Sequence, residues 1–171
     1  MAEKRAVVPA GYNAVMPYLR VAGGLDAIAF YKAAFGAKER MRLMMPDGRL
    51  GHAELLIGDS VLMLSDEFPD KDICGPKSLK GTSVTLALYV TDVDKAVAKA
   101  ATAGARILAP AQDEFYGDRT AKIEDPFGHV WSLQHQIEVV RPREMQRRLD
   151  QMLGVETQAK PKSKTSRRKA T

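Results

Sequence analysis

The chain contains one pattern twice, at an offset of 68 residues. Residues 25–37, LDAIAFYKAAFGA, align without gaps on residues 93–105, VDKAVAKAATAGA. Both copies have Asp at the second position, an alanine-rich middle and a closing Gly-Ala pair, so each predicts a helix that stops at its glycine. Two copies at so long a period indicate the duplication of a whole folding unit, not a solenoid of short repeats.

Each predicted helix, Leu25–Phe35 and Val93–Ala103, follows one strand-like segment and precedes three more. The segments are Ala14–Val21, Lys38–Met45, Arg49–Ile57 and Ser60–Ser65 in the first half, and Thr82–Val90, Arg106–Leu108, Asp118–Glu124 and His129–His135 in the second. One βαβββ unit cannot bury a face of its sheet alone. We therefore predict an α+β fold in which two βαβββ modules form a cupped mixed sheet, with a concave cleft inside and the helices outside.

The predicted organisation divides the chain into six parts. They are an N-terminal extension (1–13), the first module (14–66), a crossover loop (67–81), the second module (82–140), a C-terminal helix (141–154) and a tail (155–171). The crossover is predicted to be a loop because it has charge, prolines and no period. The last helix has Met145, Leu149, Met152 and Leu153 on one side, so we expect it to pack on the sheet or on a partner subunit.

The formal net charge of +5 lies in the tail. Beyond residue 155 there are one acidic residue, Glu156, and six basic residues: Lys160, Lys162, Lys164, Arg167, Arg168 and Lys169. The rest of the chain is neutral, which predicts no specific nucleic-acid partner, and the tail is expected to be disordered and solvated. No apolar run reaches the ~18 residues of a membrane span, so no membrane partner is predicted. The single cysteine excludes an internal disulfide and favours a cytoplasmic location.

Residues 121–136, AKIEDPFGHVWSLQHQ, predict a strand, a tight turn and a second strand. Asp125 can accept hydrogen bonds from the backbone ahead of it, and Gly128 allows a positive φ. In the second strand the side chains alternate, which places Trp131 in the core and Ser132 on the inward, cleft side. This hairpin is expected to close the second module.

Several short motifs resemble one family. They are Leu19-Arg20-Val21, Ala29-Phe30-Tyr31-Lys32, Phe35-Gly36-Ala37, Gly51-His52-Ala53-Glu54-Leu55 and Asp125-Pro126-Phe127-Gly128-His129-Val130-Trp131. Together with the duplicated βαβββ unit they resemble the vicinal oxygen chelate superfamily, which includes glyoxalase I, bleomycin-resistance proteins, fosfomycin-resistance enzymes and extradiol dioxygenases. The segments GHAELLIGD and DPFGHVWSL look most like its PhnB-like, glyoxalase-related branch.

The resemblance implies a test for a metal site. Members with metal activity hold a divalent ion with His and Glu side chains, one from each of four strands. The matching positions here are Met16, Glu54, Thr85 and Ser132, and of these only Glu54 is a plausible ligand. We therefore predict no metal ion and no other cofactor. A divalent metal held by His52, Glu54 and one further group stays open as an alternative.

Glu54 and His52 are the predicted catalytic residues. An inward carboxylate in an apolar cup can have a raised pKa and act as a general base. His52 is two residues away and shares its strand face. The alternatives are a solvated or ion-paired strand residue for Glu54 and a rim histidine for His52.

Four residues are predicted to bind the ligand. Arg20 and Arg119 suit an anionic group, and their alternative is ion pairing with acids such as Asp118 or Glu124. The loop residue Tyr116 is expected to cover the ligand, and Ser132 to contact it from the last strand.

The expected function follows from the resemblance and these residues. We predict a cytoplasmic, homodimeric, glyoxalase/bleomycin-resistance-like protein that binds a small molecule, with an anionic group, in its cleft. If it is an enzyme, a glyoxalase-like lyase is expected. The alternatives are a metal-dependent lyase or dioxygenase with an unusual ligand set, and a non-catalytic protein that binds or sequesters a drug.

Overall fold

The computed structural model describes residues 7–155 and confirms the α+β fold with two βαβββ modules. The first module consists of β1 (Tyr18–Val21), α1 (Gly24–Phe35), β2 (Lys38–Met44), β3 (Leu50–Ile57) and β4 (Ser60–Asp66). Its strands lie in the order β1-β4-β3-β2. β1 is parallel to β4, and the other neighbours are antiparallel.

The second module repeats this arrangement strand for strand. It consists of β5 (Thr85–Tyr89), α3 (Val93–Thr102), β6 (Arg106–Asp113), β7 (Asp118–Glu124) and β8 (Val130–Gln136). The strand order is β5-β8-β7-β6, again with one parallel pair, β5 and β8. The two sheets are separate and open, and the sequence repeat is therefore also a repeat of the fold.

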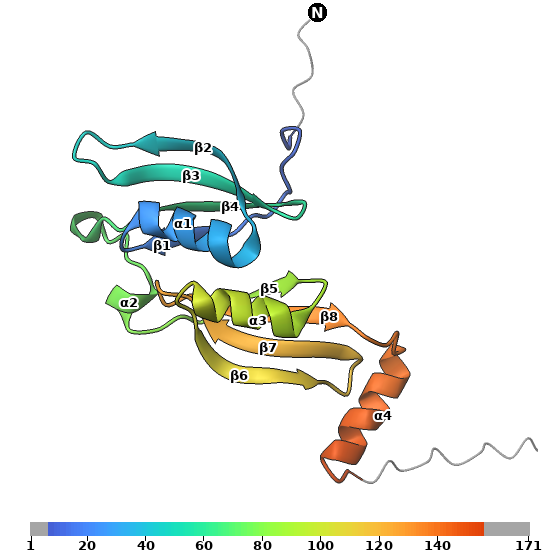
Figure 1. Ribbon diagram of the computed structural model, residues 1–171. Helices are drawn as coiled ribbons and strands as arrows, with labels where there is room; N and C mark the ends of the chain where they lie inside the picture. Colours follow the sequence, from blue (N-terminus) through green and yellow to red (C-terminus); the bar gives the residue numbers. More distant parts are fainter. Residues whose placement is uncertain (1–6, 156–171) are drawn as a thin grey trace, which may run out of the picture.

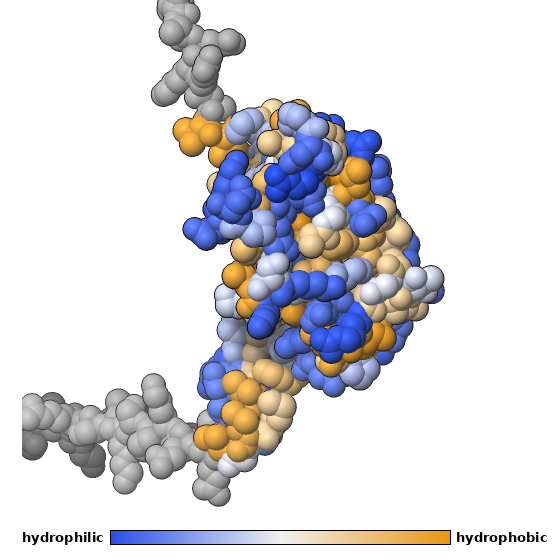
Figure 2. Space-filling model, turned by 90° about the vertical axis from the view of Figure 1, so that its left-hand side faces the viewer, coloured by the Kyte–Doolittle hydropathy of each residue, from blue (hydrophilic) through white to orange (hydrophobic). Residues whose placement is uncertain are grey.

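Helices α1 and α3 contact each other and lie on the same side of the two sheets (Figure 1). In β3, Ala53 and Leu55 are fully buried on this side, so the alternate residues His52 and Glu54 point to the other side. We call this other side the open face. Figure 2, seen from the left of Figure 1, shows that the outline of the molecule is hollowed there, between the first module and the last helix, α4 (Pro142–Met152).

One buried carboxylate joins the two modules. The Asp125 side chain, 2% exposed, accepts hydrogen bonds from the Tyr31 hydroxyl of α1 at 2.7 Å and from the Trp131 Nε1 of β8 at 3.0 Å. Its other oxygen accepts from the backbone N–H groups of Phe127 and His129, both at 2.9 Å. The predicted tight turn and the predicted core position of Trp131 are thus confirmed, and the turn also ties the last strand to α1.

Several predicted segments differ from the structure, and three of them contain prolines. β1 begins later than predicted, at Tyr18, because Pro17 has no N–H for a strand ladder. β6 is longer than predicted and runs through Pro110, which an edge strand tolerates. The crossover, predicted as a loop, contains a 3₁₀ turn (Pro69–Lys71) and the short helix α2 (Pro76–Leu79), each of which begins with a proline at a favourable helix position.

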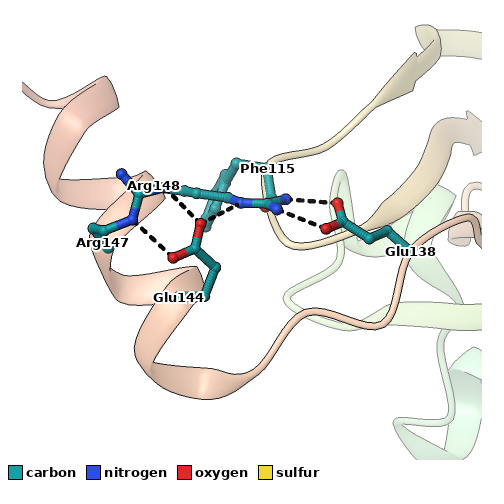
Figure 3. Close-up of polar contacts among 5 residues, drawn as sticks. All are labelled: Phe115, Glu138, Glu144, Arg147 and Arg148. Atoms are coloured by element: carbon teal, nitrogen blue, oxygen red, sulfur yellow. Dashed lines mark hydrogen bonds and ion pairs between the residues drawn. The ribbon is translucent and has the colours of Figure 1, made fainter.

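The last helix, α4, projects from the second module and buries none of its residues. One arginine anchors it (Figure 3): Arg148 donates to both carboxylate oxygens of Glu138, at 2.7 and 2.8 Å, and to the backbone carbonyl of Phe115 at 3.1 Å. Hydrogen bonds from Arg147 and Arg148 lower the pKa of Glu144 to about 2. Met145 and Leu149 on its apolar side are half-buried, and Met152 and Leu153 at its end are exposed.

The basic tail beyond residue 155 and residues 1–6 of the N-terminal extension lie outside the described residues. None of the helices described between residues 7 and 155 is long and apolar enough to span a bilayer.

Candidate functional site

The two predicted catalytic residues lie next to each other on the open face of β3. The Nε2 atom of His52 is 3.5 Å from Oε1 of Glu54, and its Nδ1 atom is 2.8 Å from the Tyr18 hydroxyl. A neutral imidazole that accepts a hydrogen bond at Nδ1 carries its proton at Nε2, the atom that faces Glu54. Tyr18, His52 and Glu54 therefore form one row of polar side chains on the open face.

Glu54 is 5% exposed because Tyr12 and Arg40 cover it. The Tyr12 hydroxyl lies 2.8 Å from both carboxylate oxygens, and Arg40 Nη1 lies 3.7 Å from Oε2. The hydrogen bond to Glu54 raises the pKa of Tyr12. A buried carboxylate is costly unless donors surround it, and here a phenol, a guanidinium and an imidazole do so.

Arg20 of β1 is the predicted anion-binding residue that still has donors to offer. Its guanidinium lies over the Tyr18 ring, 4.1 Å from the centroid, and donates one hydrogen bond to the Ser65 hydroxyl. Within residues 7–155, no carboxylate lies within ion-pairing distance of Arg20. Tyr18 and Glu54 both pair with Met63 in the sheet register, which places them on the same face. We call Tyr12, Tyr18, Arg20, His52 and Glu54 the open-face cluster.

Arg119, the other predicted anion-binding arginine, already uses all three guanidinium nitrogens in contacts with carboxylates. Its Nε and Nη2 atoms donate to Asp94 of α3 at 2.8 and 2.9 Å, and its Nη1 atom donates to Asp113 at 2.7 Å. These hydrogen bonds raise the pKa of Arg119 further above its ordinary value. The geometry favours the ion-pair alternative for this residue, with Asp94 and Asp113 as partners in place of Asp118 or Glu124.

The remaining two predicted ligand-binding residues belong to the second module. Ser132 is buried on the open side of β8 and accepts a hydrogen bond from Gln134 Nε2 at 3.1 Å. Tyr116 is half-buried in the turn before β7, where burial raises the pKa of its hydroxyl. The structure therefore brings three of the six predicted site residues into the open-face cluster and leaves Ser132 and Tyr116 on the other sheet.

A surface pocket of about 520 Å³ borders the cluster at Tyr18 and Arg20. Cys74, Pro76 and His129 also line it, and a ligand there would lie beside the free donors of Arg20. A second pocket, of about 280 Å³, lies where the two modules meet. It is more enclosed but mostly apolar, and no arginine, lysine or histidine lines it. The pocket at Arg20 is therefore the better place for an anionic ligand.

The side chains at the positions of the implied metal ligands do not fit a divalent ion. Met16 offers a thioether, and Thr85 and Ser132 offer hydroxyls, all of them poor ligands. His52 and Glu54 supply two donors, and among residues 7–155 no group of three His, Cys, Asp or Glu side chains could hold a metal. A metal site usually needs three or four such ligands, and these residues supply two.

The sequence did not single out Tyr12, Tyr18 or Arg40. Tyr18 is two residues from Arg20 on the same strand, so strand alternation could have identified it. Tyr12 lies in a segment without any period and meets a residue 42 positions away, so no local signal points to it.

Comparison with known proteins identifies the family. A family model described as the glyoxalase/bleomycin resistance protein/dioxygenase superfamily matches residues 13–133. An uncharacterised protein of Mycobacterium tuberculosis is 43% identical over 138 residues, which are 78% of this chain and 80% of the relative.

Two solved structures share the architecture. An Arabidopsis thaliana gene product superposes with a TM-score of 0.60 and 31% identity, covering 71% of this chain and 98% of that chain. A glyoxalase-related enzyme from Fulvimarina pelagi superposes with a TM-score of 0.56 over 72% of this chain and 88% of that chain; its identity of 19% shows the fold alone. The chain described here belongs to the glyoxalase/bleomycin resistance protein/dioxygenase superfamily.

Proposed function

We propose that this chain binds a small anionic molecule on the open face of its first sheet. The observation that carries the proposal is Arg20, whose guanidinium lies over the Tyr18 ring beside a pocket and near the His52–Glu54 pair. A guanidinium with free N–H groups suits a carboxylate or phosphonate, which it can bind through two parallel hydrogen bonds. Stacking on Tyr18 fixes the plane of these donors before the ligand arrives.

The chemistry that we propose for this site is proton transfer. With the anionic group of the ligand on Arg20, an acidic hydrogen of the ligand faces Glu54, which acts as the base. His52 Nε2–H can then stabilise the charge or return the proton, because it lies 3.5 Å from Glu54 Oε1. This assignment makes the chain a glyoxalase-like lyase or a related enzyme that works without the usual four-ligand metal site.

The two arginines provide a matched test of the binding proposal. In a thermal-shift screen of small carboxylic and phosphonic acids, a compound that binds the folded protein raises its melting temperature. Arg20→Gln is expected to weaken the best compound by roughly 10- to 100-fold, because hydrogen bonds to charged groups contribute ~1.5–3 kcal/mol. Arg119→Gln is the control and is expected to leave the affinity within about twofold. The opposite ranking of the two variants would contradict the proposal.

A second candidate function is non-catalytic binding, as in a protein that sequesters a drug. It is supported by the misfit of the implied metal ligands, since binding alone does not require them. The two candidates differ in the fate of the ligand. Recovery of the bound compound unchanged and in stoichiometric amount favours the binder, and conversion favours the enzyme.

We further propose that two copies of the chain form a homodimer through α4. Met152 and Leu153 are both 63% exposed at the end of the apolar stripe of this helix. Met41 and Leu43 of β2 are also exposed and pair with Glu54 and His52, so they share the open face. Two unpartnered apolar surfaces suit a two-fold dimer, in which each contact is made twice.

The dimer is tested by size-exclusion chromatography with light scattering at micromolar concentration. Leu149→Glu combined with Met152→Glu is expected to yield monomers, because it places two charges in the apolar contact. Gln151→Glu, on the opposite side of α4, serves as the control and should stay dimeric. A monomeric wild-type protein would contradict the proposal.

The PhnB-like branch and the cytoplasmic location also remain proposals. The first is supported by the segments GHAELLIGD and DPFGHVWSL, and the second by the single cysteine.

A further inference from the structure

The segment that precedes β1 passes over Glu54. Residues 7–17 form no helix or strand, and most of their side chains are exposed. At one end the Pro17 carbonyl accepts a hydrogen bond from Met63 N at 3.0 Å, and further along the Gly11 carbonyl accepts one from Arg40 Nη1 at 3.1 Å. Between these points Tyr12 is the residue that reaches Glu54.

Tyr12 contacts the site as a ligand would. Its hydroxyl donates to the Glu54 carboxylate at 2.8 Å from each oxygen, and its ring lies beneath the Arg40 guanidinium, 4.6 Å from Cζ to the ring centroid. The carboxylate takes a hydrogen-bond donor and the guanidinium takes an aromatic face. Both interactions could be made equally well by a free molecule that carries a hydroxyl on an aromatic ring.

We propose that Tyr12 is an internal occupant of the Glu54 site, and that the segment 7–17 is a strap which the ligand displaces with a phenolic hydroxyl of its own. The inference rests on the proposed function, because it takes Glu54 to belong to the ligand site. Displacement of the part before Pro17 breaks no strand ladder and no helix, since residues 7–16 form neither. The strap therefore opens by exchanging the phenol of Tyr12 for that of the ligand.

Tyr12 is tethered to the protein and competes with a free phenol for Glu54, and this competition determines how much the removal of Tyr12 should change phenol binding. A group held by a short linker acts at an effective concentration of roughly millimolar or above. A free phenol must exceed that concentration before it replaces Tyr12, so removing Tyr12 should tighten phenol binding by at least about tenfold. The same removal should have no effect on phenol binding elsewhere on the molecule.

The probe for this test is p-cresol, which is the side chain of tyrosine as a free molecule. Its binding is measured by ligand-observed NMR on the full chain as wild type, Tyr12→Ala, Tyr12→Ala with Glu54→Gln, and Tyr89→Ala. Tyr89 is a matched control because its hydroxyl also donates to a carboxylate, that of Asp118, at 2.9 Å on the second sheet. Tyr12→Phe keeps the ring and removes only the hydroxyl, so it tests the same contact with the smallest change to the strap.

We expect p-cresol to bind Tyr12→Ala at least about tenfold more tightly than the wild type or Tyr89→Ala, with Tyr12→Phe in between. Glu54→Gln should abolish the gain. Equal binding by wild type and Tyr12→Ala, or no binding by either, overturns the strap and leaves the proposed function standing. Tighter binding that survives Glu54→Gln removes Glu54 from the site and overturns both.

Discussion

Asp125→Ala is expected to lower the free energy of unfolding by about 3–5 kcal/mol, because it removes four hydrogen bonds and leaves buried donors unsatisfied. The Tyr31 hydroxyl and the Trp131 indole N–H would both lose their partner inside the core shared by the modules. Burial and the adjacent Asp125 carboxylate raise the pKa of Tyr31, so its hydroxyl is a donor at neutral pH. Urea denaturation followed by circular dichroism measures the loss.

Two other variants make this prediction specific. Asp94→Ala removes a carboxylate whose side chain is 61% exposed and is paired with Arg119, and such surface pairs contribute about 0–1 kcal/mol. Asp125→Asn keeps an oxygen for the turn but leaves the Trp131 N–H without an acceptor, so its loss should lie between those of the other two. If Asp125→Ala costs no more than Asp94→Ala, the carboxylate does not hold the modules together.

Glu54→Gln is expected to slow proton transfer by at least about 100-fold, the usual contribution of a general base. The substitution keeps the size of the side chain but replaces the charged, basic carboxylate with a neutral amide, which is a weaker acceptor for the Tyr12 hydroxyl. The measurement is the incorporation of deuterium from D₂O into the small acid selected by the thermal-shift screen, followed by proton NMR. This exchange reports removal of a C–H proton without requiring that the final product be known.

Glu124→Gln is the matched control for this substitution. Glu124 lies on β7 in the second sheet and pairs with Arg106 at 2.8 Å, away from the open-face cluster. It should exchange the acid at the rate of the wild type. Unchanged deuterium incorporation in Glu54→Gln would remove Glu54 as the base.

The repeat at an offset of 68 residues predicted the fold because it can be read from the sequence without knowledge of any tertiary contact. Both helices, the four strands around each and the final hairpin occur in the predicted order, although β1 and β5 begin later than predicted and β6 ends later. The sequence could not reveal that Asp125, predicted as a turn residue, also binds Tyr31 and Trp131. That role depends on how α1 packs against the second module, which no local pattern encodes.

The candidate site was predictable as far as strand alternation reaches. His52 and Glu54 share a face by spacing alone, and the structure keeps them together. Arg119 shares a strand face with the buried residues Ala121 and Ile123, so its position already favoured the helix side, where Asp94 holds it. Residue type alone makes Arg20 and Arg119 equally good candidates for anion binding. The structure distinguishes them, because Arg20 lies on the open face and Arg119 is paired with Asp94 on the helix side.

Tyr12 contacts the candidate site but is not predicted by any sequence pattern. It belongs to a segment without periodicity, and its contact with Glu54 exists only because the first sheet is already formed. Segments of this kind have no pattern that relates them to a distant strand. Their contribution to a site becomes visible only in three dimensions.

The central claim is that the ligand lies on the open face of the first sheet, and amide chemical-shift mapping tests it most directly. The ¹⁵N-labelled wild-type protein is titrated with the acid selected by the screen, and the shifts are followed residue by residue. We predict that the largest changes fall on β1, on β3 around His52 and Glu54, and on the segment around Tyr12. Changes confined to β6–β8 or to α4, with the first sheet unaffected, would contradict the claim.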